Sequence, residues 1–287
     1  MKRPALAALA CALALSACSV KTVAVRATAA VVSDGTPALR EEPDPLFARD
    51  ALPGQLKLLE GLLRDAPKDP RLLSALSEGF VGYAFMFLED EQPDRARDMY
   101  RRALGYALRL AALNGDLAAI AVARPDALDA ALARARLQDV PGLYWAAYAW
   151  AGWANLAKGD PEALAGMSRA QSVMRRVLAL DPGFQFGGPD IFFGIYYCAL
   201  PKMAGGDPDK GKAHFEAALA RSKGKFLMAK VLYARYYAVA ALDEALFRRL
   251  NEEVLAASGE DLPQARLTNE VAKLKAKKLL EKTNELF

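Results

Sequence analysis

The stretch "GGDPDKGKAHF", residues 205–215, follows most of the phosphate-loop pattern G-x-x-x-x-G-K-[ST]. The pattern starts at Gly206 and its lysine is Lys212, but Ala213 stands where a hydroxyl should bind Mg²⁺. A phosphate loop follows a β-strand, whereas the residues before these glycines are predicted to be helical. We therefore interpret the stretch as a turn in which Asp207 caps the next helix and Lys212 is solvated, without nucleotide binding.

The same stretch holds the only histidine of the chain, His214, sixteen positions after Cys198. A Cys–His nucleophile also needs an orienting third group and an oxyanion site, and nothing in the sequence specifies either. Cys198 lies in the apolar segment "FFGIYYCAL", where a small buried thiol is the ordinary outcome. One histidine and three cysteines exclude a multi-histidine metal site. The sequence therefore predicts no catalytic residue, no cofactor and no metal, and a protein that is not an enzyme.

The segment "LYWAAYAWAGWANLA", residues 143–157, contains all three tryptophans of the chain. On a helical wheel of about 100° per residue, Trp145, Trp153 and Trp150 fall near 0°, 80° and 140°, and two tyrosines flank them. A helix that is apolar on all sides is either a central core helix or the wall of an aromatic-lined cavity. Such a cavity would suit organic anions or hydrophobic solutes. The cavity hypothesis names five wall residues: Trp145, Trp150, Trp153, Tyr196 and Tyr197.

The N-terminus has the features of a secretion signal. A basic start precedes a short apolar run that ends in "LSAC" at residues 15–18. This box is typical of a bacterial lipoprotein signal, in which the signal peptide 1–17 is removed and the Cys18 thiol carries the lipid. An ordinary signal peptide with a chance cysteine is the alternative, and the apolar run is too short for a transmembrane helix.

The expected location is therefore the periplasm, with the protein anchored by its lipid to a bacterial membrane. Ser19, the residue after the lipidated cysteine, favours the outer membrane. Residues 18–44 are expected to form a tether and linker because they are rich in turn-forming residues towards their end. If Cys18 is lipidated and Cys11 is removed, Cys198 has no partner for a disulfide.

From residue 45 to residue 287 the sequence predicts a single all-α domain. Asp-Pro pairs at Asp69, Asp160 and Asp207 are typical of helix starts, because Asp caps free N–H groups and Pro has no N–H to lose. No run alternates as a β-strand would. The expected helices are 46–64, 70–89, 93–113, 125–136, 142–158, 161–180, 189–200, 208–222, 225–240, 242–257 and 263–284.

The composition fits such a domain. The 287-residue chain is 53% hydrophobic and has a formal net charge of +4, with basic and acidic residues interspersed. No nucleic-acid partner is expected from so mild a charge.

Three segments, 94–108, 166–182 and 209–222, share small residues, a Met or aromatic residue and Leu at helical spacing. They are similar to the second helix of a tetratricopeptide repeat, although their spacing is irregular. We expect degenerate tetratricopeptide-like pairs in one superhelical or bundle-like domain.

Four stretches together resemble one family, the T component associated with TRAP transporters (the TatT family). They lie at residues 41–90, 143–164, 187–239 and 265–287, and include "LYWAAYAWAGWANLAKGDPEAL" and "GGPDIFFGIYYCALPKMAGGDPDKGKAHF". The resemblance implies a lipid-anchored periplasmic protein of tetratricopeptide-like helices that forms oligomers around a ligand-accessible cavity. It also implies a partner, the periplasmic solute-binding component of the transporter, and brings no catalytic residues.

The resemblance therefore favours a binding or adaptor lipoprotein of a TRAP-type importer. The alternative is a helical-repeat scaffold lipoprotein in envelope assembly, without a solute of its own, and a hydrolase is a distant third. The first function predicts genes for a membrane permease and a solute-binding protein beside this one.

Overall fold

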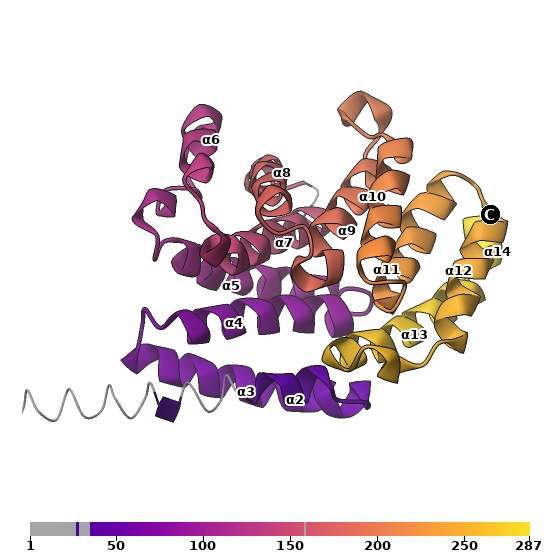
Figure 1. Ribbon diagram of the computed structural model, residues 1–287, viewed down its shortest axis with the longest axis horizontal. Helices are drawn as coiled ribbons and strands as arrows, with labels where there is room; N and C mark the ends of the chain where they lie inside the picture. Colours follow the sequence, from indigo (N-terminus) through magenta and orange to yellow (C-terminus); the bar gives the residue numbers. More distant parts are fainter. Residues whose placement is uncertain (1–26, 29–34, 158) are drawn as a thin grey trace, which may run out of the picture.

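The computed structural model describes residues 27–28, 35–157 and 159–287, most of which are helical (Figure 1). No strand occurs within these ranges, so the predicted all-α class is confirmed. The signal peptide 1–17 and Cys18 lie outside the described residues, and both stay predictions. The following helices make up the first part of the fold: α2 (Thr36–Arg40), α3 (Pro45–Asp65), α4 (Pro70–Tyr83), α5 (Pro93–Ala111), α6 (Pro125–Ala133), α7 (Val140–Leu156) and α8 (Pro161–Leu180). The second part consists of α9 (Phe184–Ala199), α10 (Pro208–Arg221), α11 (Leu227–Leu232), α12 (Glu244–Ala256), α13 (Arg266–Glu281) and α14 (Thr283–Leu286).

Asp-Pro pairs begin four of these helices, as the sequence predicts for three of them. The Asp69 carboxylate accepts hydrogen bonds from the backbone N–H groups of Arg71 and Leu72, at 3.0 and 3.2 Å. Asp44 and Asp160 cap α3 and α8 in the same way, and Asp207 caps α10 by accepting a single backbone N–H. Each cap satisfies N–H groups that have no partner inside the helix and contributes about 1 kcal/mol.

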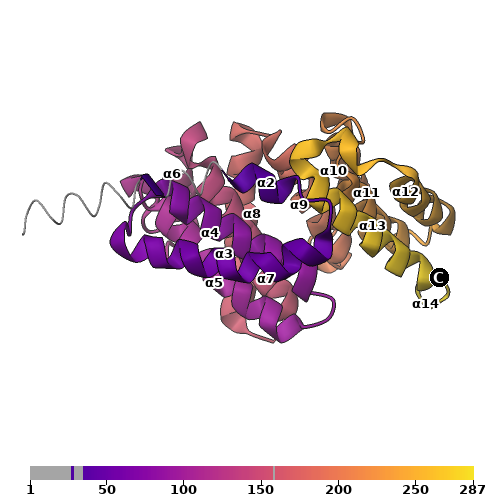
Figure 2. The ribbon, with the colours of Figure 1, turned by 90° about the horizontal axis from the view of Figure 1, so that it is seen from below.

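Neighbouring helices along the chain pack against one another. Helix α3 packs on α4, α4 on α5, and α7 lies between α5 and α8, while α9 packs on α10 and α12 on α13. The tetratricopeptide-like character of these pairs stays a prediction. The chain then closes on itself, because α2 and α3 contact α13 near the other end of the sequence (Figures 1 and 2).

The buried apolar residues form two clusters. The first joins the helices from α3 to α9 and includes Leu76 and Trp150. The second joins Ala48 of α3 to the helices from α9 to α13 and includes Phe247. Leu39 of α2 and Phe85, which follows α4, are packed against both clusters. The seam between the two clusters therefore runs past α2 and the end of α4.

Two helices continue as π-helical turns, Ala84–Leu88 after α4 and Tyr233–Ala238 after α11. In the first, the N–H of Glu89 donates to the carbonyl of Ala84, five residues earlier, at 2.9 Å. A π turn holds one extra residue and therefore redirects the side chains that follow; such turns are frequent at functional sites.

By length and composition, Pro70–Leu88 is the one described segment that could cross a membrane, and half of its most apolar window is buried within the fold.

Candidate functional site

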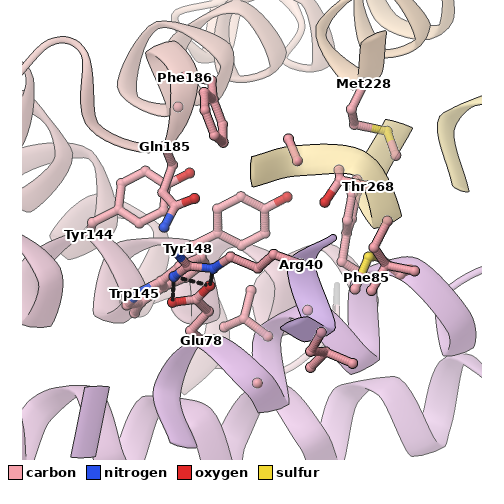
Figure 3. A pocket seen from close by; sticks show the side chains of 18 of the residues that line it. Arg40, Glu78, Phe85, Tyr144, Trp145, Tyr148, Gln185, Phe186, Met228 and Thr268 are labelled. Atoms are coloured by element: carbon pink, nitrogen blue, oxygen red, sulfur yellow. Dashed lines mark hydrogen bonds and ion pairs between the residues drawn. The ribbon is translucent and has the colours of Figure 1, made fainter. Parts of the chain in front are cut away.

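A cavity of about 160 Å³ lies at the seam between the two apolar clusters (Figure 3). Its walls come from α2, α3, α4 and the π turn after it, α7, the start of α9, α11 and the start of α13. Most of the wall is apolar; examples are Leu52, Leu56, Val81, Ile191, Met228 and Leu267. The cavity thus forms where segments distant in the sequence meet.

One ion pair lies at the edge of this cavity. The Arg40 guanidinium donates from Nε and Nη2 to the two carboxylate oxygens of Glu78, at 2.8 and 2.7 Å. This bidentate pair joins α2 to α4. Among the described residues that line the cavity, Arg40 is the only cation and Glu78 the only anion. The lining therefore carries no net charge.

Two tyrosine hydroxyls of α7 face the same space. Tyr144 is only 4% exposed, and Tyr148 lies one helical turn further on, with 6.0 Å between the ring centroids. Neither hydroxyl makes a hydrogen bond to any residue that the structure describes. Burial, followed by the negative charge of Glu78, raises the pKa of Tyr144, and burial likewise raises the pKa of Tyr148. Both therefore stay protonated at neutral pH and are able to donate.

The start of α9 forms the opposite wall through an unusual turn. Gln185, Phe186 and Gly187 all have left-handed backbones, with φ of 48°, 59° and 89°. Left-handed non-glycine residues are strained and occur often at binding sites. A stacking contact between Phe186 and Phe226, at 5.2 Å between centroids, holds the turn against the start of α11. Figure 3 shows Gln185 directed into the cavity.

Gly188 completes this turn by allowing a close backbone approach. A side-chain Cβ at this position would overlap the Tyr144 hydroxyl and lie 2.8 Å from its ring. Tyr144 also has edge contacts with Phe184, at 5.0 Å, and with Trp145, at 4.8 Å. The glycine and the two aromatic neighbours therefore fix the direction of the Tyr144 hydroxyl.

Of the five aromatic wall residues that the sequence suggests, only Trp145 lines this cavity. Trp150 packs over Gly166 of α8, and Trp153 lies under the Arg101 guanidinium at 5.4 Å. Tyr196 and Tyr197 lie near the far end of α9, where Tyr197 stacks on His214. The physical reason is that α7 is surrounded by other helices, so only one of its faces meets the cavity.

The residues that sequence reasoning missed are mostly polar. Tyr144 and Tyr148 flank the tryptophans in the sequence, but no pattern there relates Arg40, Glu78 and Gln185 to a site. The adjacent glycines Gly187 and Gly188, in "DPGFQFGGPD", were the one available sign of a special backbone at this wall.

No hydrogen bond joins the Cys198 thiol to the His214 ring, both of which the structure describes. The His214 ring bonds through Nδ1 to the buried carboxylate of Asp190, at 2.8 Å, and Arg221 donates to the other oxygen, also at 2.8 Å. This charge-paired group ties α9 to α10. Burial raises the pKa of Cys198 to about 11. Its thiol is therefore protonated at neutral pH and is a poor nucleophile.

The phosphate-loop match is a turn in the structure. Asp207 accepts a hydrogen bond from the N–H of Lys210 and caps α10, as predicted, so a carboxylate occupies the helix start. Lys212 is about half exposed, and its Nζ lies 4.0 Å from Oε1 of Glu216. Within the described ranges, no group of three or more His, Cys, Asp or Glu could hold a metal ion.

Comparison with protein families gives a match to the TRAP transporter T-component over residues 41–287. Comparison with curated proteins finds no match. The matched range holds every helix from α3 onwards, and thus nearly the whole cavity. The chain belongs to the family of TRAP transporter T-components.

Proposed function

We propose that the protein is a lipid-anchored adaptor that faces the periplasm and serves a TRAP-type solute import system. In this role it contacts the solute-binding component of the transporter and holds a small ligand in the cavity of Figure 3. Membership of the T-component family supports the association with a TRAP system. The lipoprotein box at residues 15–18 supports the anchor.

The observation that carries ligand binding is the cavity itself. A space of about 160 Å³ with mainly apolar walls favours a ligand that covers those walls and removes them from water. The left-handed turn at the start of α9 borders this space, as do the hydroxyls of Tyr144 and Tyr148, which have no partner among the described residues. This combination of apolar walls with a few placed polar groups is typical of small-molecule sites.

The proposal assigns no catalytic step to the protein. Cys198 and His214, both in the described part of the chain, share no hydrogen bond, and the Cys198 thiol is protonated at neutral pH. The cavity lining contains neither residue. We infer that any ligand is held and released without chemical change.

The test of the adaptor role is co-purification. The tagged full-length protein is expressed with the solute-binding protein encoded beside it, and the two are expected to elute together. A TRAP solute-binding protein from a different gene cluster is the control. If the chain has no such neighbour, or if it captures only proteins of envelope assembly, the scaffold function replaces the adaptor function.

A further inference from the structure

The polar groups of the cavity define the chemical class of the ligand more narrowly than its apolar walls do. This inference rests on the proposed function in one respect, namely that the cavity holds a ligand. Four properties of the cavity decide the class: its size, its charge, its unpaired hydroxyls and the positions of these hydroxyls.

Size sets the first limit. An engineered apolar cavity of about 150 Å³ binds benzene, so a space of about 160 Å³ accepts one ring or a short chain with one further group. The ligand is therefore small, unless it extends out of the cavity beside α2.

Charge sets the second limit. Within the described part of the lining, Arg40 is the only cation and Glu78 the only anion, and they are bonded to each other in bidentate geometry at 2.8 and 2.7 Å. A charged ligand would find no free opposite charge inside. An unpaired charge in an apolar cavity is strongly unfavourable, and a carboxylate would also be repelled by Glu78. The lining therefore disfavours organic anions.

The hydroxyls of Tyr144 and Tyr148 indicate which group the ligand should carry. Tyr144 is more than nine-tenths buried, and its hydroxyl lies beside the cavity without a hydrogen-bond partner among the described residues. Tyr148, one turn along α7, is partly buried, and its hydroxyl likewise has no hydrogen-bond partner among the described residues. Figure 3 shows both rings reaching towards the space between Glu78, Gln185 and Thr268. Each hydroxyl therefore has hydrogen-bonding capacity that no described residue uses, and a ligand oxygen between the two could bond to both.

We propose that the cavity binds an uncharged amphipathic molecule, with a small apolar body and one hydroxyl or carbonyl oxygen that bonds to the hydroxyls of Tyr144 and Tyr148. The apolar body lies against the leucine, methionine and phenylalanine side chains of α3, the π turn after α4 and α11. The Arg40–Glu78 pair stays closed and excludes acidic molecules of the same size.

Three probes with the same ring separate the contributions of apolar contact, hydrogen bonding and charge to the affinity. They are toluene, benzyl alcohol and benzoate. Each is titrated into the purified protein at neutral pH, and the heat of binding gives the affinity. Benzyl alcohol is expected to bind at least tenfold tighter than benzoate, and about fivefold tighter than toluene because of its hydrogen bond. Benzoate that binds as tightly as benzyl alcohol, or the absence of binding by all three, overturns the proposal.

Two variants test the assigned residues. Tyr144→Phe with Tyr148→Phe should reduce the affinity for benzyl alcohol to that for toluene and leave toluene unchanged. Glu78→Gln should leave Arg40 unpaired and raise the affinity for benzoate about tenfold, with little effect on benzyl alcohol. Tyr233→Phe is the matched control, because it removes a buried tyrosine hydroxyl outside this cavity. Unchanged benzyl alcohol affinity in the double variant would contradict the role of the tyrosines.

The wild-type comparison of the three probes does not depend on the folding of any variant. It is also independent of the adaptor role. If co-purification succeeds while no probe binds, the ligand class is wrong and the adaptor function stands. If the probes bind as expected and co-purification fails, the ligand class stands and the adaptor function is wrong.

Discussion

Arg235 and Asp90 join the two π-helical regions of the fold, with 3.3 Å between Nη1 of the arginine and Oδ1 of the carboxylate. Asp90 lies two residues after the end of the first π turn, and Arg235 lies within the second. Lys275 of α13 bonds to the other oxygen of Asp90. The Asp90 carboxylate therefore links the segment after the first π turn to the second π turn and to α13.

Asp90→Asn is expected to lower the free energy of unfolding by about 1.5–3 kcal/mol, because Lys275 is only 11% exposed and loses its charged partner. Denaturant unfolding followed by circular dichroism measures the change. Asp126→Asn is the control, since Asp126 is exposed and lies 3.9 Å from Arg124; such a pair contributes little. Equal stability of the two variants would contradict the linking role of Asp90.

Gly188→Ala is expected to destabilise the protein by about 1–3 kcal/mol, because the new methyl group overlaps the ring and hydroxyl of Tyr144. Gly105→Ala is the matched control: it lies inside α5 with no atom within 4 Å of the added methyl, and it should be neutral or stabilising by up to about 1 kcal/mol. Thermal unfolding compares the two. A Gly188→Ala protein as stable as the wild type would show that Tyr144 is free to move.

Glu60 should make the stability of the protein depend on acid pH. Burial alone would raise its pKa, but hydrogen bonds from Lys57, Tyr106 and Arg102 outweigh burial and lower the pKa to about 2. A carboxyl whose folded pKa is depressed stabilises the fold above its unfolded pKa, and that contribution is lost as the pH falls from about 4.5 towards 2. Glu60→Gln should therefore show a smaller loss of stability over this range than the wild type does.

The measurement for Glu60 is denaturant unfolding at a series of pH values from 6 to about 2. Glu252→Gln, which removes an exposed carboxylate, is the control and should retain the wild-type pH profile. A Glu60→Gln profile that coincides with the wild type would show that the contacts with Lys57, Tyr106 and Arg102 do not stabilise the charged form.

Cys18→Ala should abolish lipid attachment and release the protein from the membrane fraction. Multiple acyl chains are needed for stable anchoring, and Cys18 in the "LSAC" box is the predicted attachment site. Intact-mass analysis and membrane fractionation measure the result, and Cys198→Ala is the matched control. Continued membrane association of the Cys18→Ala protein would show that the anchor lies elsewhere.

The sequence predicts the elements of this fold well because their signals are local. Asp69 and Asp160, each followed by proline, set helix starts that the structure confirms, and the apolar helix around Trp150 is buried at the centre as its pattern indicates. Most helix limits agree within a few residues. The π turns were not predicted, because one extra residue in an apolar helix leaves the composition unchanged.

The site was much less predictable, because it depends on contacts between distant segments. Arg40, Glu78, Tyr144 and Gln185 come from four different elements, and no spacing in the sequence relates them. The aromatic wheel of α7 identified the correct helix but could not show which face meets the cavity. Trp145 lies on that face, whereas Trp153 packs towards α5, under the Arg101 side chain.

The contact of α2 and α3 with α13 also bears on the order in which the molecule folds. Most of its helices pack on near neighbours in the sequence, and such local contacts form early. The walls of the cavity, in contrast, extend from Leu39 to Thr268, so they come together only after most of the chain has left the ribosome. The entropic cost of closing so long a loop grows only slowly with its length. The cavity is thus among the last parts of the protein to be completed during synthesis, and a chain that stops before α13 has the aromatic helix α7 but lacks one wall of the cavity beside it.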